Sequence, residues 1–273
     1  MTLGQEFHGW GFTLNDEIEN LRDAQKHLLV INLGATAIGT TVTAAPGYPE
    51  LASKYLAELT GLPFKNSADL IAATSDCGAY MTLSSTIKGL AVKMTKICND
   101  IRLLASGPRC GLKEINLPQL QPGSSIMPGK VNPVAAEVAN QASFLAIGLD
   151  TTVMLAASAG QLELNVMEPV ITYALFTQMK VMANACDTLR TKLVDGVTAN
   201  TERCRDYVMN SIGIVTLLKP HFGYQVCADI AKEGYISGKS LHQIVVDERK
   251  LLTQKEWDEI FNTQNLINPK FVK

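Results

Sequence analysis

The sequence predicts an all-α fold: a bundle of long helices followed by a small helical C-terminal domain. Two observations lead to this prediction. Hydrophobic residues make up 47% of the chain and aromatic residues only 6%, so the apolar mass is mostly aliphatic and favours packed helices over a β-sandwich. The second observation is a long stretch in the first half of the chain with apolar residues at helical spacing.

This strongest helical signal lies between about residue 69 and Ser106. Its apolar residues follow one another at intervals of three and four, as in the seam of a coiled coil. They are Tyr80, Leu83, Ile87, Leu90, Met94, Ile97, Ile101 and Leu104. Lys88, Lys93 and Lys96 fall off this seam and are predicted to face solvent. Since burying each seam residue stabilises by about 1.5–3 kcal/mol, we expect the face to be covered, in part by other copies of the chain.

Three further helices are predicted. They run from Asn15 to about Leu29, from Asn132-Pro133 onward with Asn132 as N-cap, and from Glu168-Pro169 to Leu193. The second of these helices carries apolar residues at helical spacing: Val138, Ala142, Leu145 and Leu149. In the third, Met179, Met182 and Leu189 are expected to face inward. More frequent glycines after residue 196 place a domain boundary there. Residues 1–196 are predicted to form the bundle and residues 197–273 the small domain.

Charge and cysteine content exclude several classes of protein. A formal net charge of −2 gives no basic surface for nucleic acid or an anionic membrane. Charged residues interrupt every long apolar run, so no membrane span is predicted. The six cysteines show no metal-ligand spacing and are predicted to be reduced thiols in a cytoplasmic protein.

The segment from Gly123 to Pro133 contains the most informative polar residues. It places two serines, Lys130 and Asn132 in a flexible stretch that leads into a helix N-terminus. Backbone N–H groups and the positive end of a helix dipole attract anions, and Lys130 adds a full charge. The residues alone therefore indicate a carboxylate or phosphate site. An ordinary Gly/Ser loop with a solvated lysine explains the same residues equally well.

The same segment matches the pattern Gly-Ser-Ser-x-Met-Pro-x-Lys-x-Asn at every specified position of residues 123–132. It resembles the signature loop of the aspartase/fumarase superfamily, and residues 32–40, 96–117 and 160–170 resemble other blocks of that superfamily. Residues 114–118, Val134 and the run Gly160-Gln161-Leu162-Glu163 are more similar to the aspartase branch than to the fumarase branch.

The resemblance implies a role for each matching residue. Ser124 corresponds to the general base that removes the Cβ proton, and Lys130 and Asn132 correspond to ligands of the substrate carboxylate. Glu137 matches a carboxylate that supports the site from behind these ligands. Stabilisation of the helix dipole by a first-turn glutamate explains Glu137 at least as well.

The reaction implied is the reversible conversion of L-aspartate to fumarate and ammonia, without a metal or organic cofactor. The resemblance also implies a homotetramer with active sites built from three chains. Two alternatives remain open. One is fumarate hydratase, and the other is a helical oligomer without catalytic activity.

Two departures from the family pattern are expected to matter. Thr41 and Thr43 stand where relatives usually have Gly and Asn, and a β-branched residue disfavours positive φ, so the local turn is expected to differ. Residues 1–7 resemble an internal family segment, so we expect the other substrate-binding blocks to lie upstream of Met1. The chain alone is then expected to be inactive. Residues 121–131 are expected to move as a lid.

Overall fold

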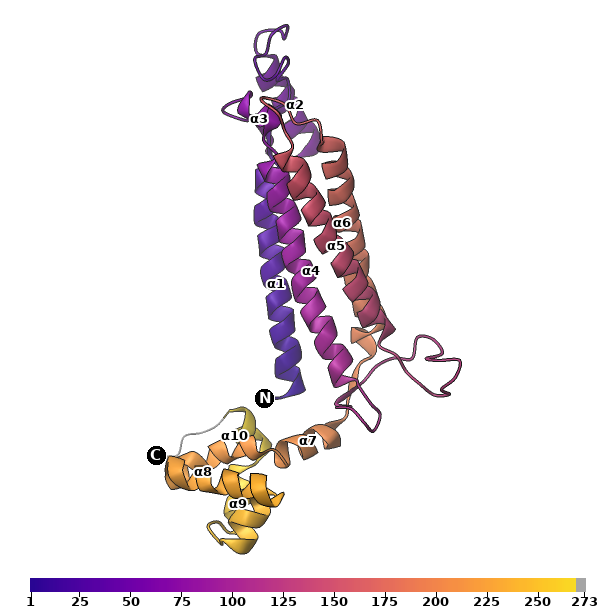
Figure 1. Cartoon of the computed structure of the whole chain (residues 1–273). Helices are drawn as coiled ribbons and strands as arrows, with labels where there is room; N and C mark the ends of the chain where they lie inside the picture. The colour runs from indigo at the N-terminus through magenta and orange to yellow at the C-terminus, as the bar shows by residue number, and fades with distance from the viewer. Residues whose placement is uncertain (269–273) are drawn as a thin grey trace. The chain divides into compact units, whose positions relative to one another are not determined.

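The computed structural model describes residues 1–268 and confirms the all-α fold (Figure 1). The strands found in this part of the chain span two residues each. β1 (Val30–Ile31) pairs in parallel with β2 (Lys65–Asn66), and β3 (Ile115–Asn116) pairs antiparallel with β4 (Thr198–Ala199). These strands tie loops together, whereas the long helices provide the core.

The chain divides into two compact units. The bundle unit comprises Gly9–Ser106 and Leu117–Val197, and the C-terminal unit comprises Met1–His8, Gly107–Asn116 and the chain from Thr198 onward. The helices with most or all of their residues in the bundle unit are α1 (Leu3–His27), α2 (Tyr48–Thr60), α3 (Ala72–Ser75), α4 (Gly78–Leu104), α5 (Val134–Ser158), α6 (Glu168–Lys192) and the 3₁₀ turn η1 (Val194–Gly196). Helices α4, α5 and α6 pack along one another and form the centre of this unit (Figure 1).

Helix α4 follows the predicted seam closely. Ile87, Met94 and Ile101 are almost fully buried, as the spacing of three and four predicts. The helix ends at Leu104, and Gly107 follows in a backbone conformation with φ 134°. The predicted stop at Ser106-Gly107-Pro108 is therefore confirmed. Tyr80, at the start of the seam, is 37% exposed.

Helices α5 and α6 lie where they were predicted. In α6, Met182 and Leu189 are buried as predicted, whereas Met179 is exposed and its predicted inward position is wrong. In α5, Val138 and Leu145 have helical spacing but are exposed. The buried face of α5 is made mainly of small residues: Ala135, Ala136, Ala139, Asn140, Ser143, Ala146, Asp150, Val153 and Ala156. Small residues let neighbouring helices approach closely. The large apolar side chains of α5 consequently point away from the chain's own core.

A buried polar layer crosses the three central helices. Ser84 Oγ donates to Asp150 Oδ1 at 2.7 Å, and Gln178 Nε2 donates to the carbonyl oxygen of Ala146 at 2.9 Å. Lys88 Nζ lies 2.6 Å from Asp150 Oδ2. The layer satisfies polar groups that would otherwise be costly to bury, because each has a partner.

The prediction that Lys88 and Lys93 are simply solvated is therefore wrong. Lys88 pairs with Asp150, and Lys93 pairs with Glu17 of α1, whose carboxylate is also buried. Lys96 is exposed, as predicted. The off-seam spacing correctly places the lysines beside the apolar face. Lys88 and Lys93, however, each pair there with a carboxylate from another helix.

Replacing Asp150 by alanine is expected to lower the free energy of unfolding by about 2 kcal/mol, because Ser84 and Lys88 both lose a charged partner. The side chain of Lys88 is 40% exposed, so water compensates part of this loss. Urea denaturation measures the change. Asp187→Ala removes an exposed pair with Arg190 and is expected to cost less than about 0.5 kcal/mol. Equal losses in the two variants would contradict a stabilising role for the layer.

Helix α1 begins at Leu3, so the predicted start at Asn15 is wrong. Gly9 and Gly11 weaken the helical signal in its first half, because glycine is a poor helix former. Helix α2 was not predicted at all. It begins after Gly47, with Pro49 in its first turn, and ends at Gly61 in the left-handed conformation.

The loop after β1 contains an unusual run of left-handed residues. Thr41 and Thr43 have φ of 61° and 71°, and Ala37 and Ile38 also have positive φ. Thr41 therefore adopts the positive φ that a β-branched residue disfavours, and a difference of this turn from that of relatives stays a prediction. Such residues store local strain, because left-handed conformations crowd a Cβ atom. Gly39 lies within this run, where an added Cβ would lie 2.4 Å from the backbone of Ile71.

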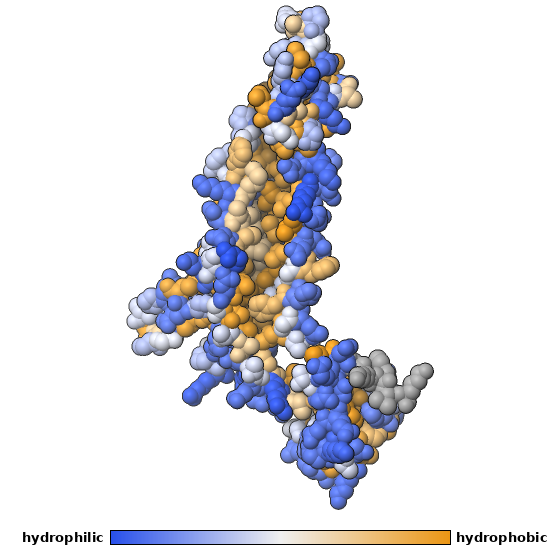
Figure 2. Space-filling model, turned by 180° about the vertical axis from the view of Figure 1, so that it is seen from behind, coloured by the Kyte–Doolittle hydropathy of each residue, from blue (hydrophilic) through white to orange (hydrophobic). Residues whose placement is uncertain are grey.

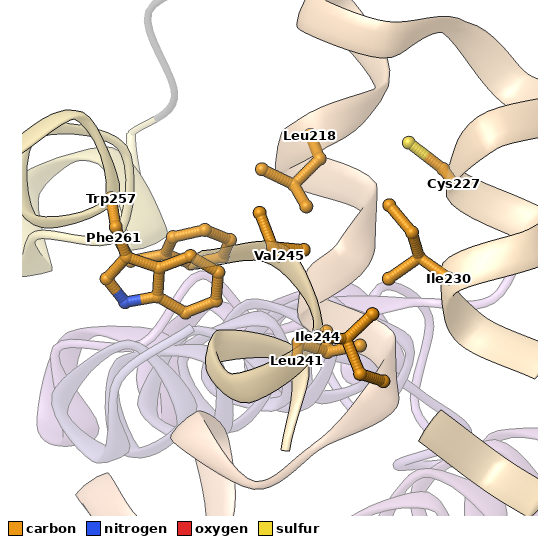
Figure 3. Packing of buried hydrophobic residues seen from close by; sticks show 8 residues of the cluster. All are labelled: Leu218, Cys227, Ile230, Leu241, Ile244, Val245, Trp257 and Phe261. Carbon is orange, nitrogen blue, oxygen red and sulfur yellow. The ribbon is translucent and has the colours of Figure 1, made fainter. Parts of the chain in front are cut away.

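The C-terminal unit has a separate hydrophobic core. Its elements are α7 (Thr201–Met209), η2 (Ile212–Leu218), α8 (Lys219–Ser237), the π-helical segment η3 (Gln243–Glu248), α9 (Gln254–Ile260) and α10 (Thr263–Ile267). Trp257 and Phe261, whose ring centroids lie 3.9 Å apart, stack at one side of this core, and Leu218 and Val245 lie between them and Ile230 (Figure 3). Thr253 and Glu256 cap α9 reciprocally.

Helix α5 is long and apolar enough to cross a membrane by length and composition alone, although the sequence predicted no membrane span. Core helices of soluble proteins pass the same test. Helix α5 packs on both α4 and α6 and carries Asp150 in the polar layer. Its apolar character therefore belongs to a bundle helix, one side of which lies against the rest of the chain.

Candidate active site

The predicted signature segment forms a loop between β3 and α5 with a tight neck. A Cβ atom built on Gly123 would lie 1.9 Å from the carbonyl oxygen of Lys130, so the two backbones approach so closely that only glycine fits at position 123. Gly129 turns the chain at φ 78°. The amide of Lys130 donates to the carbonyl oxygen of Met127 at 3.3 Å. Residues 123 and 130 therefore meet at the neck of the loop.

Asn132 closes this neck with its side chain. Its Nδ2 donates to the carbonyl oxygen of Gly123 at 2.5 Å. The prediction that Asn132 caps the following helix is wrong, because α5 begins at Val134 with Pro133 in the N-cap position and no side-chain cap. In this structure the amide nitrogen of Asn132 holds the loop together. Its predicted contact with a substrate carboxylate remains a prediction.

Ser124 lies half-buried just inside the neck. Its Oγ accepts the backbone N–H of Ile126 at 3.1 Å and that of Met127 at 3.2 Å. Two donors on one hydroxyl oxygen stabilise negative charge there, and they leave the hydroxyl proton free to be lost. The loop therefore directs two backbone N–H donors at Ser124 Oγ, and the role of this serine as a base remains a prediction.

Lys130 is exposed and forms no ion pair with any of residues 1–268. Its charge is therefore available to an anion that approaches the loop. Ile126 is 86% exposed and Met127 51% exposed, so the tip of the loop projects into solvent. The structure thus brings Ser124, Lys130 and Asn132 into one small loop, as the motif predicts.

Glu137 lies in the first turn of α5 and is half-buried. A carboxylate at this place stabilises the positive end of the helix dipole. This location agrees with the structural explanation of Glu137, and its support of the site remains a prediction.

Two other kinds of catalytic group find no support in the described part of the chain. Residues 1–268 contain no cluster of three His, Cys, Asp or Glu side chains that could hold a metal. Burial raises the pKa of Cys98 to about 12, and burial also raises the pKa of Cys186 and Cys227. These thiols therefore stay protonated and are unsuited to act as nucleophiles.

An open groove of about 750 Å³ lies between α1 and α4. Glu17, Asn20, Thr82 and Ser85 are among its lining residues, and none of the three predicted loop residues lines it. This groove was not predicted from the sequence. The signal that indicates a polar face there is a run of polar residues in α1 at intervals of three and four: Glu17, Asn20, Asp23 and His27.

Family comparisons agree with the fold and the loop. A family model described as "Lyase" matches residues 1–148, and a model described as "Fumarase C C-terminus" matches residues 214–268. The first match covers more than half of the chain and includes the whole signature loop. The chain belongs to the fumarate lyase family.

The particular relatives are more specific. The chain is 55% identical to the aspartate ammonia-lyase of Escherichia coli (strain K12) over 271 residues, which are 99% of this chain and 56% of that protein. It is 52% identical to the aspartate ammonia-lyase of Helicobacter pylori (strain ATCC 700392 / 26695) over 273 residues, which are 100% of this chain and 58% of that protein. The chain thus spans about half the length of the curated relatives it matches.

Among solved structures, the fold matches the recombinant class II fumarase from Schistosoma mansoni with a TM-score of 0.92 and 32% sequence identity. The match covers 98% of this chain and 59% of that structure. The predicted resemblance to the aspartase/fumarase superfamily is confirmed.

Proposed function

We propose that this chain supplies the catalytic loop of an aspartate ammonia-lyase, which converts L-aspartate reversibly into fumarate and ammonia. The observation that carries the proposal is the environment of Ser124 in the signature loop, where two backbone N–H groups donate to its Oγ. More than 50% identity to relatives named aspartate ammonia-lyase supports the choice of substrate.

The reaction begins with removal of the Cβ proton of L-aspartate by the Ser124 alkoxide. The electrons of the broken C–H bond move into the neighbouring carboxylate, which becomes an aci-carboxylate with two negative charges. Because the charge of Lys130 and the positive end of α5 lie in or beside the loop, they are suited to stabilise this group. The electrons then return to form the double bond, the C–N bond breaks, and ammonia leaves.

The scheme needs neither a metal nor an organic cofactor, because the substrate's own carboxylate accepts the electrons. The base must be poised as an alkoxide, and the N–H groups of Ile126 and Met127 contribute to this. A serine without such donors is too weak a base for a carbon acid.

Fumarate hydratase is the second candidate function. The fold similarity to a class II fumarase and the match to the fumarase C-terminal model favour it. Both reactions remove a Cβ proton beside a carboxylate, and they differ in the leaving group. A substrate comparison therefore separates them, because an ammonia-lyase acts on L-aspartate and a hydratase on L-malate.

The assay requires a complete site. We define the complementing segment as the part of the Escherichia coli relative outside the matched region, and the completed complex as this chain co-expressed with it. The completed complex is expected to form fumarate from L-aspartate at least a hundredfold faster than from L-malate, as expected of a site that holds one leaving group. Preference for L-malate would replace the proposed function by the second candidate.

We also propose that the chain assembles into a homotetramer in the cytoplasm. Its six cysteines are unpaired, as expected of a reducing compartment. A hydrophobic strip runs along the bundle (Figure 2). Large exposed apolar residues of α5 and α6 are Val138, Phe144, Leu145, Met154, Leu155, Val170, Tyr173, Phe176 and Met179. Contiguous apolar surface of this kind is rare on monomers and marks an interface between proteins.

Phe176→Glu is expected to break this assembly into smaller species, because a charge at the centre of a hydrophobic interface is costly to bury. Sedimentation velocity at micromolar concentration measures the result. Tyr235→Glu is the matched control, because Tyr235 is also a strongly exposed aromatic residue and lies in the C-terminal unit. A wild-type chain that sediments as a well-folded monomer would contradict the proposed assembly.

A further inference from the structure

Both ends of the signature loop converge on the C-terminal end of α6. Leu117, Pro118 and Leu120 precede the loop, Asn132 to Ala135 follow it, and the two segments meet Lys192 and Leu193 without room for a water molecule between them. Leu193 is 1% exposed and forms the floor of this contact. All of these residues belong to the bundle unit.

The tightest contact at this place is between Pro118 and Gly196. A Cβ atom built on Gly196 would lie 2.6 Å from Pro118 Cγ, closer than real Cβ atoms approach other atoms. Gly196 is not among the residues with positive φ, so its backbone conformation suits any residue. Position 196 therefore requires glycine because Pro118 lies so close, and not because of its backbone conformation.

We propose that Gly196 is a positioning residue for the signature loop: it leaves the space that seats Pro118 and so fixes the entry of the loop. The effect of this contact on catalysis rests on the proposed function. The seat itself, which is the contact between Gly196 and Pro118, does not depend on any activity.

The contact is close enough to the loop to act on it. Pro118 lies five residues before Gly123, and Pro122 lies directly before it. Proline fixes φ, so a segment with two prolines transmits a displacement better than a flexible one. A shift of Pro118 is therefore expected to strain the neck where Gly123 meets Lys130, and to weaken the N–H donors on Ser124.

The test is a double-mutant cycle on this chain, with hydrogen exchange as the readout. Gly196→Ala is expected to increase amide exchange in residues 121–131 about tenfold, because overpacking at the seat displaces Pro118. Pro118→Ala removes the Cγ atom that Gly196→Ala meets, so the double variant is expected to return to within about threefold of the exchange rate of Pro118→Ala.

Gly11→Ala is the matched control, since an added Cβ there meets nothing within 4 Å. It is expected to leave exchange in residues 121–131 unchanged. Exchange in the middle of α4 reports whether the bundle stays folded. Unchanged loop exchange in Gly196→Ala, or no recovery in the double variant, would overturn the proposal.

Kinetics of the completed complex test the catalytic meaning separately. Gly196→Ala is expected to lower kcat about tenfold with a smaller change in KM, and Pro118→Ala is expected to restore kcat in the double variant. A loosened loop with wild-type kcat would overturn the positioning role. Absence of activity in the wild-type completed complex would instead refute the proposed function, and the exchange cycle would still decide the seat.

Discussion

Replacing Ser124 by alanine is expected to lower kcat for fumarate formation by about 10²–10⁴-fold in the completed complex, the range that a general base contributes. The physical reason is that Ser124 Oγ is the oxygen on which two backbone N–H groups converge. Alanine removes the base and leaves the loop without a group to accept the Cβ proton. Steady-state fumarate formation measured by ultraviolet absorbance gives kcat and KM for each variant.

Folding is expected to survive this substitution, because Ser124 is small, half-buried and borne on a loop. Ser125→Ala, which removes the neighbouring exposed hydroxyl, is the matched control and should keep kcat within a few-fold of wild type. Lys130→Ala is expected to raise KM and lower kcat together, because its charge meets the carboxylate in ground state and transition state alike. A near-normal kcat in Ser124→Ala would assign the base to another residue.

The chain by itself is expected to show no measurable aspartate deamination. In the proposed scheme its loop supplies a base in Ser124 and carboxylate ligands in Lys130 and Asn132, whereas the transition state carries two negative charges on one carboxylate and needs several fixed donors. Each missing donor costs about 2.7–4 kcal/mol of transition-state stabilisation, so the loss of several approaches the whole rate enhancement. A substrate held at one end also samples unproductive orientations.

The measurement compares three samples: the purified chain, the complementing segment, and the completed complex. Only the completed complex is expected to produce fumarate above background. Sedimentation of the purified chain serves as the control for folding and assembly. Deamination by the purified chain at a rate typical of enzymes would contradict this prediction and our placement of the remaining donors outside the chain.

Sequence patterns predict the helices of this protein better than the faces of those helices. The seam of α4 could be predicted because Ile87, Met94 and Ile101 are large and regularly spaced. In α5 the same reasoning selects Val138 and Leu145, which are exposed in the single chain. Apolar spacing indicates that a face becomes buried, but it does not distinguish burial within one chain from burial against another copy.

Polar contacts between helices could not be predicted for a related reason. Lys88 and Lys93 have the spacing of solvated residues, and their partners Asp150 and Glu17 lie more than 60 positions away in the sequence. Nothing local indicates such pairs. The left-handed conformations of Thr41 and Thr43 likewise depend on the surrounding loop, which overrides the preference of β-branched residues.

The site was found largely through its motif, and its internal geometry required the structure. Ser124 and Lys130 follow from the resemblance of residues 123–132 to a known loop. The contact between Gly123 and Lys130 and the hydrogen bond from Asn132 to Gly123 depend on how the loop folds back on itself. The sequence motif identifies the residues of the loop, whereas the contacts at its neck, which hold the backbone in place, are visible only in the structure.

The most direct test of the central claim is the transfer of a proton at Cβ. The completed complex is incubated with fumarate and ammonia in deuterated water, and deuterium at Cβ of the L-aspartate formed is followed by NMR. We predict incorporation of one deuterium by the wild type and by Ser125→Ala, and none above background by Ser124→Ala. Incorporation of deuterium at the wild-type rate in Ser124→Ala would contradict the assignment of Ser124 as the catalytic base.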